Sequence, residues 1–238
     1  MFKKLKIFIF ILILMFASSE IIAKESNNSI SLNSNKPIYF LLGKDKDKDI
    51  VSKFQISVRV NLIDNTCFNF GYTQKSFWDI GKKSGPFRES NYNPELFCKL
   101  EFKDNITHII NTQFGYEHES NGKDKKDSRS WERAYLKNDF KLTNYSELSL
   151  KFWYPFFLHE NRDLLNYYGK WEHSIKFGTD NIEFKYTKRI KQEYYDFIIG
   201  GWISNVYFHV QKFNGYGESL IDYNKYEKWT RYGITFIK

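Results

Sequence analysis

Hydrophobic and polar positions alternate with a period of two along most of this chain. The clearest run is residues 54–62, in which every second side chain is apolar and those between are polar. Successive side chains of a β-strand point to opposite faces, so the pattern predicts strands with one apolar and one polar face. We expect strands near residues 37–43, 52–62, 66–78, 93–102, 106–120, 130–140, 146–156, 167–177, 181–190, 195–204, 206–217 and 228–237.

An all-β fold follows, and we expect a twelve-stranded antiparallel transmembrane β-barrel with a polar interior. Bacterial single-chain barrels have an even number of strands. Alternation alone does not show which face is buried, since a soluble β-sandwich has the same period. The composition favours the barrel, because 19% of the residues are aromatic although the mean hydropathy is only −0.57. Aromatic girdles and a polar lumen are typical of membrane barrels.

The N-terminus has the features of a secretory signal: Lys3, Lys4 and Lys6 precede an apolar run over residues 7–17. This run is shorter than the ~20 residues of a membrane-spanning helix, although an uncleaved anchor is the alternative. The net charge of +8 is spread over turns, which suits anionic lipid headgroups and predicts no nucleic-acid partner. We expect a signal peptide at 1–23, a flexible periplasmic segment at 24–36 and an outer-membrane barrel at 37–238.

The two cysteines, Cys67 and Cys98, could form a disulfide after export. By alternation Cys67 shares a face with Asn69, whereas Cys98 shares one with Leu96 and so faces the other way. The pattern therefore argues against a disulfide between them. It argues against a metal site as well, because two isolated cysteines do not supply a ligand set.

His118 and Ser120 lie on the apolar face of a predicted strand, together with Phe114 and Tyr116. A serine becomes a useful nucleophile when a base removes its proton, and a third group then orients the imidazole. Glu132 on the next strand is another polar residue on an apolar face. A His-x-Ser pair also occurs by chance, but three polar residues on neighbouring apolar faces suggest a catalytic triad at a lipid-facing surface.

Residues 121–128 (NGKDKKDS) join these two strands. Gly122 permits a tight turn whose backbone N–H could face an oxyanion. The loop is rich in oxygen ligands of the kind that Ca²⁺ prefers, but it lacks the spacing of an EF-hand. From the residues alone, a solvated loop of mixed charge is the favoured interpretation.

Six blocks carry a resemblance to a known family: residues 72–78 (YTQKSFW), 86–92 (PFRESNY), 94–97 (PELF), 115–122 (GYEHESNG), 128–131 (SRSW) and 215–224 (GYGESLIDYN). In this order they resemble the outer membrane phospholipase A family, over most of the chain from about residue 37 onward. The resemblance implies a twelve-stranded outer-membrane barrel. It also implies a calcium-dependent phospholipase A1 and A2 that hydrolyses sn-1 and sn-2 acyl esters of phospholipids and lysophospholipids, active as a homodimer.

The resemblance also assigns roles to single residues. It implies that Ser120 is the nucleophile, that His118 is the general base and that Gly122 offers an oxyanion N–H. The Ca²⁺ ligands that it implies are the Lys123 carbonyl, the Ser128 hydroxyl and the carbonyl of the partner subunit's Ser84, with Glu160 as a further acidic position.

One position departs from the family pattern, because Glu132 stands where the family commonly has Asn. A carboxylate can accept the same imidazole hydrogen bond, so we expect a working Ser-His-Glu triad. The alternative is a compromised enzyme with a costly charge at a lipid-facing site. Gln74, also outward by alternation, is expected at the dimer interface or near the headgroups. A non-catalytic small barrel or porin is the competing functional hypothesis.

Overall fold

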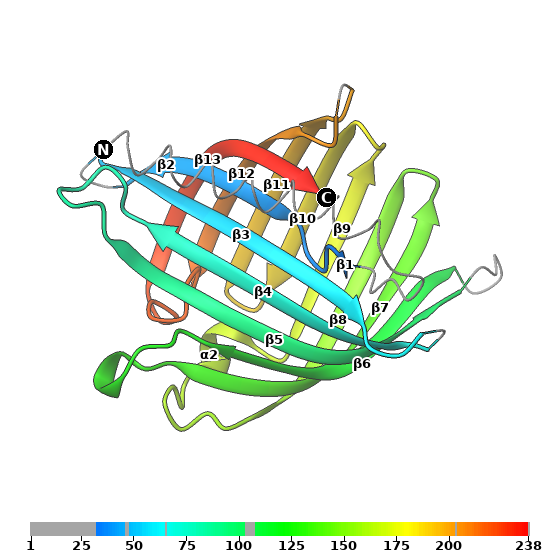
Figure 1. Ribbon diagram of the computed structural model, residues 1–238, viewed down its shortest axis with the longest axis horizontal. Coiled ribbons are helices and arrows are strands. Elements are labelled where there is room, and N and C mark those ends of the chain that lie inside the picture. The colour runs from blue at the N-terminus through cyan, green and yellow to red at the C-terminus, as the bar shows by residue number, and fades with distance from the viewer. Residues whose placement is uncertain (1–31, 46–47, 65, 103–107, 203, 238) are drawn as a thin grey trace, which may run out of the picture.

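The chain folds as a closed antiparallel β-barrel, in a computed structural model that describes residues 32–45, 48–64, 66–102, 108–202 and 204–237 (Figure 1). Each barrel strand pairs with the strands before and after it, and β2 pairs with β13 to close the wall. The expected signal peptide at 1–23 lies outside the described residues. The twelve barrel strands are β2 (Ile38–Lys44), β3 (Ile50–Asn61), β4 (Phe68–Trp78), β5 (Phe87–Glu101), β6 (Ile109–Ser120), β7 (Ser130–Thr143), β8 (Ser146–Phe156), β9 (Trp171–Gly178), β10 (Ile182–Arg189), β11 (Gln192–Gly200), β12 (Tyr207–Tyr216) and β13 (Tyr226–Ile237).

The strand count and the all-β class predicted from alternation are confirmed, with differences at some strand ends. The strand expected at 167–177 begins only at Trp171, because Leu165–Tyr168 form the short helix α2. Gly169, at φ +70°, ends this helix. The strand expected at 195–204 lies at 192–200, where two consecutive positive-φ glycines, Gly200 and Gly201, end it. No helix in the described part of the chain is long and apolar enough to cross a membrane.

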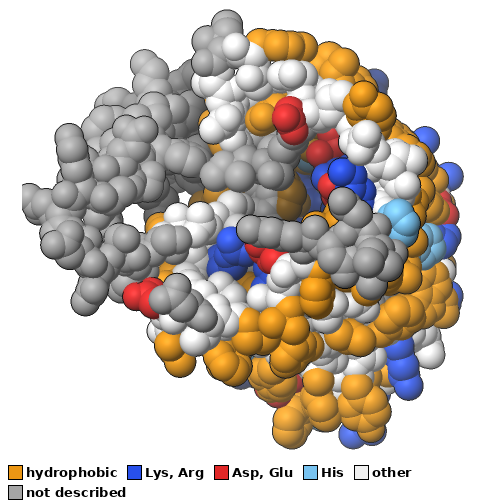
Figure 2. Space-filling view, turned by 90° about the vertical axis from the view of Figure 1, so that its right-hand side faces the viewer, with side chains coloured by type: hydrophobic (Ala, Val, Ile, Leu, Met, Phe, Trp, Pro, Cys, Tyr) orange, Lys and Arg blue, Asp and Glu red, His pale blue; other side chains and the backbone are white. Residues whose placement is uncertain are grey.

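The two faces of the wall have opposite chemistry. Large apolar side chains project outward from the strands, among them Phe70, Leu96, Phe114 and Leu136, and each is at least one third exposed. Seen from one end, hydrophobic side chains cover much of the outside that is in view, and Lys, Arg, Asp and Glu side chains lie in the hollow (Figure 2). Lipid is the solvent that suits such an outer surface, so the outward face is the membrane face.

The interior is filled at the barrel end that carries loops 79–86, 121–129, 157–170 and 217–225, which we call the loop end. There Trp131 and Trp153 of the wall pack against residues of two loops, Tyr168 and Leu220 among them, in a buried aromatic cluster. Glu218 fixes the last loop inside the barrel, because its carboxylate pairs with Arg231 at 2.5 and 2.9 Å and with Lys53 at 3.1 Å. Between this cluster and the opposite end, the turn end, lie polar cavities of about 350 and 220 Å³.

The N-terminal segment is held against the wall from residue 32 onward. Leu32–Asn33 form β1, which pairs with Val60 and Arg59 of β3. The chain then enters the barrel, where the Lys36 ammonium contacts Glu117 at 3.1 Å. The sequence predicts a flexible segment at 24–36. Its residues 32–36 contact β3 and buried acidic side chains inside the barrel, partners that alternation does not reveal. Residues 24–31 lie outside the described residues.

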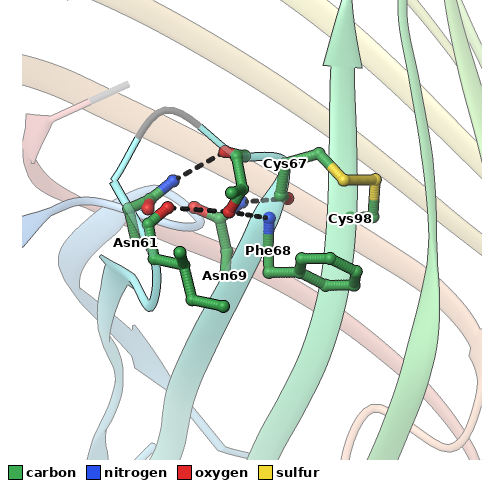
Figure 3. The surroundings of a disulfide bond; sticks show 7 residues. Asn61, Cys67, Phe68, Asn69 and Cys98 are labelled. Carbon is green, nitrogen blue, oxygen red and sulfur yellow. Dashed lines mark hydrogen bonds between the residues drawn. A yellow bond between two sulfur atoms is a disulfide. The ribbon is translucent and has the colours of Figure 1, made fainter.

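Cys67 and Cys98 form a disulfide, with their Cα atoms 4.6 Å apart (Figure 3). The prediction from alternation is wrong here, because Cys67 precedes β4 and its side chain need not follow the alternation of that strand. In the β4–β5 register the residue opposite Cys98 is Phe68. Cys67 lies one residue before it, in the turn, where the Lys99 N–H donates to its carbonyl at 2.9 Å. A turn residue can direct its side chain toward either face, so Cys67 reaches its partner.

Candidate active site

His118 and Glu132 face each other across neighbouring strands on the outside of the barrel. The β6–β7 register places them directly opposite, with His118 Nδ1 3.4 Å from Glu132 Oε1. The Asn121 N–H donates to the Arg129 carbonyl at 3.0 Å, so alternation along the ladder makes 118–132 a non-hydrogen-bonded pair. Side chains approach most closely in such pairs. The local strand geometry therefore brings the imidazole and the carboxylate together.

Both side chains are only partly covered. The imidazole is 33% exposed and the carboxylate 24%. Their facemates Phe114 and Tyr116 are more than 40% exposed, whereas Glu117, between Tyr116 and His118, is 1% exposed inside the barrel. The outward placement predicted from alternation is thus confirmed. With Nδ1 next to Glu132, the other ring nitrogen, Nε2, is available to a second partner on the same face.

Tyr116 completes the surroundings of the carboxylate. Its hydroxyl donates a hydrogen bond to Glu132 Oε2, the oxygen that does not face His118. Both carboxylate oxygens of Glu132 therefore have a partner at a surface where an unpaired charge is costly. Alternation along the sequence places Tyr116 on the correct face but indicates no role for it. The contact follows from the β6–β7 register, which places Tyr116 opposite Ala134 and therefore diagonal to Glu132.

Ser120 ends β6 two residues beyond His118 and on the same face. Its ladder partners are Tyr92 on β5 and Ser130 on β7. The wall is continuous on both sides of Ser120, and the loop that follows begins at the next residue. The hydroxyl thus lies at the loop end of the apolar surface, where headgroups and acyl chains of a bilayer meet.

Asn121 organises the loop that follows the serine. It is 4% exposed, and its side-chain oxygen accepts the N–H groups of Lys123 at 3.3 Å and Arg129 at 3.0 Å. Its amide nitrogen donates to the Asp127 carbonyl at 2.8 Å. Strand alternation does not single out Asn121, although Asn immediately before a turn glycine is a known local signal. One side chain therefore fixes the loop between β6 and β7.

Gly122 occupies a conformation and a space that another residue would not fit. Its φ is +63°, and a Cβ there would approach the Tyr92 ring to 2.9 Å. Among the described residues its N–H has no backbone partner. The backbone at this position is thus held close to Ser120 by the turn and by Tyr92.

The four residues expected at a calcium site lie on three loops of the loop end. Ser84 lies on loop 79–86 at φ +71°, Lys123 and Ser128 on loop 121–129, and Glu160 on loop 157–170. The described residues contain no group of three or more His, Cys, Asp and Glu side chains that could hold a metal ion. A site on these loops would therefore depend largely on backbone and hydroxyl oxygens, which is compatible with Ca²⁺ but not with a transition metal.

One observation favours a cation near Glu160. Its Oε2 is buried and has no hydrogen-bond partner within the described part of the chain. The next residue, Asn161, accepts the Ser130 N–H at 3.2 Å, so this loop lies beside the start of β7, close to Ser128. An unpaired buried carboxylate oxygen on this loop is a ligand that fits a hard cation.

Comparisons with known proteins identify the family. The profile of the family described as "Phospholipase A1" matches residues 10–236. The chain belongs to the phospholipase A1 family. It is 32% identical to the phospholipase A1 of Salmonella typhimurium over 222 residues, 87% of this chain and 75% of the relative. It is also 32% identical to that of Escherichia coli K12 over 197 residues, 76% of this chain and 67% of the relative.

Solved structures of this family share the barrel. The outer membrane phospholipase A of Escherichia coli superposes with a TM-score of 0.80 at 24% identity, over 91% of this chain and 96% of that one. A calcium-bound dimer of the Salmonella typhi outer membrane phospholipase gives a TM-score of 0.80 at 24% identity, over 88% and 94%. This phospholipase A1 family member is therefore a twelve-stranded barrel of the outer-membrane type, as predicted.

Proposed function

We propose that this protein is a calcium-dependent outer-membrane phospholipase that hydrolyses fatty-acyl esters of phospholipids and lysophospholipids at sn-1 and sn-2. Family membership supports the phospholipase class. The observation that carries the proposal is the His118–Glu132 contact on the outward face, two residues from Ser120. A base, its orienting carboxylate and a serine thus share a surface that faces lipid.

In the proposed reaction Ser120 Oγ attacks the ester carbonyl carbon while its proton passes to His118 Nε2. The C–O bond to glycerol breaks, His118 returns the proton to the leaving oxygen, and an acyl-serine remains. Water then attacks this ester with the same base, releasing the fatty acid and restoring Ser120. Glu132 holds the imidazole by Nδ1 and stabilises its positive charge during both steps.

The developing oxyanion needs donors close to the nucleophile. The Gly122 N–H, two residues from Ser120 and held by Asn121 and Tyr92, is placed to supply one. When bound, Ca²⁺ adds positive charge that polarises the ester carbonyl. The residues proposed to hold it are Ser128, the Lys123 carbonyl and Glu160, with the partner subunit's Ser84.

A homodimer is part of the proposal because the calcium site is divided between subunits. The Salmonella typhi enzyme forms a calcium-bound dimer. In this chain, β4 carries an outward line of polar groups: Tyr72 donates to Gln74 at 3.2 Å, and Gln74 donates to Ser76 at 3.1 Å. Polar groups on a lipid-facing wall are stabilised when a second wall covers them, which supports Gln74 as a dimer contact. The filled loop end of the lumen gives no support to a porin.

The decisive experiment measures phospholipid hydrolysis in detergent micelles for the parent protein and for Ser120→Ala, each with Ca²⁺ or with a chelator. We expect Ser120→Ala and the chelator each to lower the rate by at least about 10³-fold, while the barrel keeps its resistance to heat in detergent. Ser130→Ala, on the same face directly across the ladder, is the matched control and should remain active. Hydrolysis by Ser120→Ala at the parent rate would refute the assignment.

A further inference from the structure

A proline lies in the middle of β5, directly across the ladder from His118. The described strands β5 and β6 pair on both sides of this point, but they skip two pairs, Asn93–Glu119 and Pro94–His118. Both pairs depend on the same hydrogen bond, from the N–H of residue 94 to the His118 carbonyl. Proline has no N–H, so it removes this bond from an interior strand, a position where proline is rarely found. The gap falls at the proposed catalytic base.

The side chain of Asn93 fills the gap. Its amide nitrogen donates to the His118 carbonyl at 2.6 Å, from inside the barrel. Asn93 is 7% exposed, so little water competes for this bond. The side-chain amide of one residue thus replaces the backbone N–H of the next. The carbonyl of the proposed base remains bonded although the ladder is interrupted.

Lys36 fixes the orientation of that amide. Its ammonium donates to Asn93 Oδ1 at 2.7 Å, which requires the amide nitrogen to point toward His118. The same ammonium contacts Glu117 at 3.1 Å and Glu95 at 3.4 Å. Lys36 belongs to the segment that enters the barrel before β2, and its neighbour Asn35 donates to Glu95 at 2.6 Å. The N-terminal segment therefore reaches the back of the active site.

We propose that Asn93 is a positioning residue for His118, that Lys36 holds it in place, and that it substitutes for the ladder hydrogen bond that Pro94 removes. The inference rests on the proposed function, in which His118 is the base. The backbone of residue 118 determines how far its ring lies from Glu132 on one side and from Ser120 on the other. Without a bond at this carbonyl, β6 would be free to move relative to β5 at the proposed base, whose geometry the reaction needs.

The test compares Asn93→Ala, Pro94→Ala and the double variant in the micelle assay with Ca²⁺. We expect Asn93→Ala to lower kcat about tenfold with little change in KM, because a misplaced base slows the chemistry rather than substrate binding. Alanine at position 94 restores the missing N–H. The double variant should therefore recover to within about twofold of Pro94→Ala alone. A residue that merely stabilised the fold would show the same loss in both backgrounds.

Asn91→Ala is the matched control. Asn91 is an asparagine on the same strand and the same inner face, but its side chain accepts the Leu220 N–H at 3.3 Å and contacts a loop rather than β6. We expect it to keep the parent kcat. Lys36→Met should show a smaller loss than Asn93→Ala, since it frees the amide without removing the donor.

Amide hydrogen exchange gives a readout that does not depend on hydrolysis. We expect exchange at residues 117–119 to accelerate in Asn93→Ala and to slow again in the double variant. If the parent protein hydrolyses no phospholipid, the proposed function fails, and the exchange result still decides whether Asn93 supports this part of β6. Parent-like kcat and exchange in Asn93→Ala, or an equal loss with and without Pro94, would overturn the inference.

Discussion

The two faces of β6 differ in how their charged side chains are paired, although residues of the two faces alternate along one strand. Inside the barrel, Glu117 is held by Arg133 at 2.7 Å, by Lys151 at 2.7 Å and by Lys36 at 3.1 Å. Outside, the next residue, His118, has the carboxylate of Glu132 at 3.4 Å. The inner face pairs one anion with three cations, whereas the outer face gives each polar group few partners and leaves it partly exposed.

This difference assigns folding stability to the inner face and the proposed proton transfer to the outer face. An ion network in a polar lumen fixes strands β6, β7 and β8 relative to one another, and removing Glu117 takes away the anion that its three cations share. A group that exchanges a proton with a substrate needs a ring nitrogen without another partner and a position that the substrate can reach. The outer face provides both. Substitutions on the two faces should therefore affect different properties of the protein.

The largest effect on folding is expected for Glu117→Ala. It would leave Arg133, Lys151 and Lys36 without their shared anion, and we expect a loss of about 3 kcal/mol in the free energy of unfolding. Urea denaturation in lipid vesicles measures this quantity. The matched control is Glu147→Ala, because the Glu147–Lys176 pair at 2.7 Å is about 40% exposed and should contribute less than about 1 kcal/mol. Equal losses in the two variants would contradict the contrast between buried and exposed pairs.

An intermediate effect, on activity alone, is expected for Tyr116→Phe. The variant removes the hydroxyl that bonds Glu132 Oε2 but keeps the ring on the outer face. Without this bond the carboxylate is free to rotate away from His118. We expect kcat to fall about fivefold, the size of one hydrogen bond of roughly 1 kcal/mol, with no change in unfolding. Tyr154→Phe, on the outer face of β8, is the control and should keep the parent kcat. A change in the unfolding midpoint of Tyr116→Phe would instead indicate a structural role.

The outward position of His118, Ser120 and Glu132 could be predicted from sequence, because a period of two determines which side chains share a face. The strand count followed from the same rule. The rule applies only within strands, however, and it therefore failed at Cys67, which lies in a turn, and at residues 167–168, which belong to α2. It also does not reveal partners across strands. The contacts of Tyr116 with Glu132 and of Asn93 with His118 depend on register, which only the folded barrel provides.

The smallest effect is expected for Glu132→Asn, which introduces the residue that the family resemblance leads one to expect. The Asn side chain keeps one oxygen to accept the imidazole N–H, so we expect kcat within about threefold of the parent. It has no second oxygen that needs Tyr116 as a donor. Tyr116→Phe should therefore cost activity when position 132 is Glu and little when it is Asn, a coupling that a double-mutant cycle measures directly. An equal cost in both backgrounds would show that Tyr116 acts on something other than the carboxylate. A large loss in Glu132→Asn alone would show instead that the charge of Glu132, and not only its hydrogen bond, stabilises the imidazolium in this barrel.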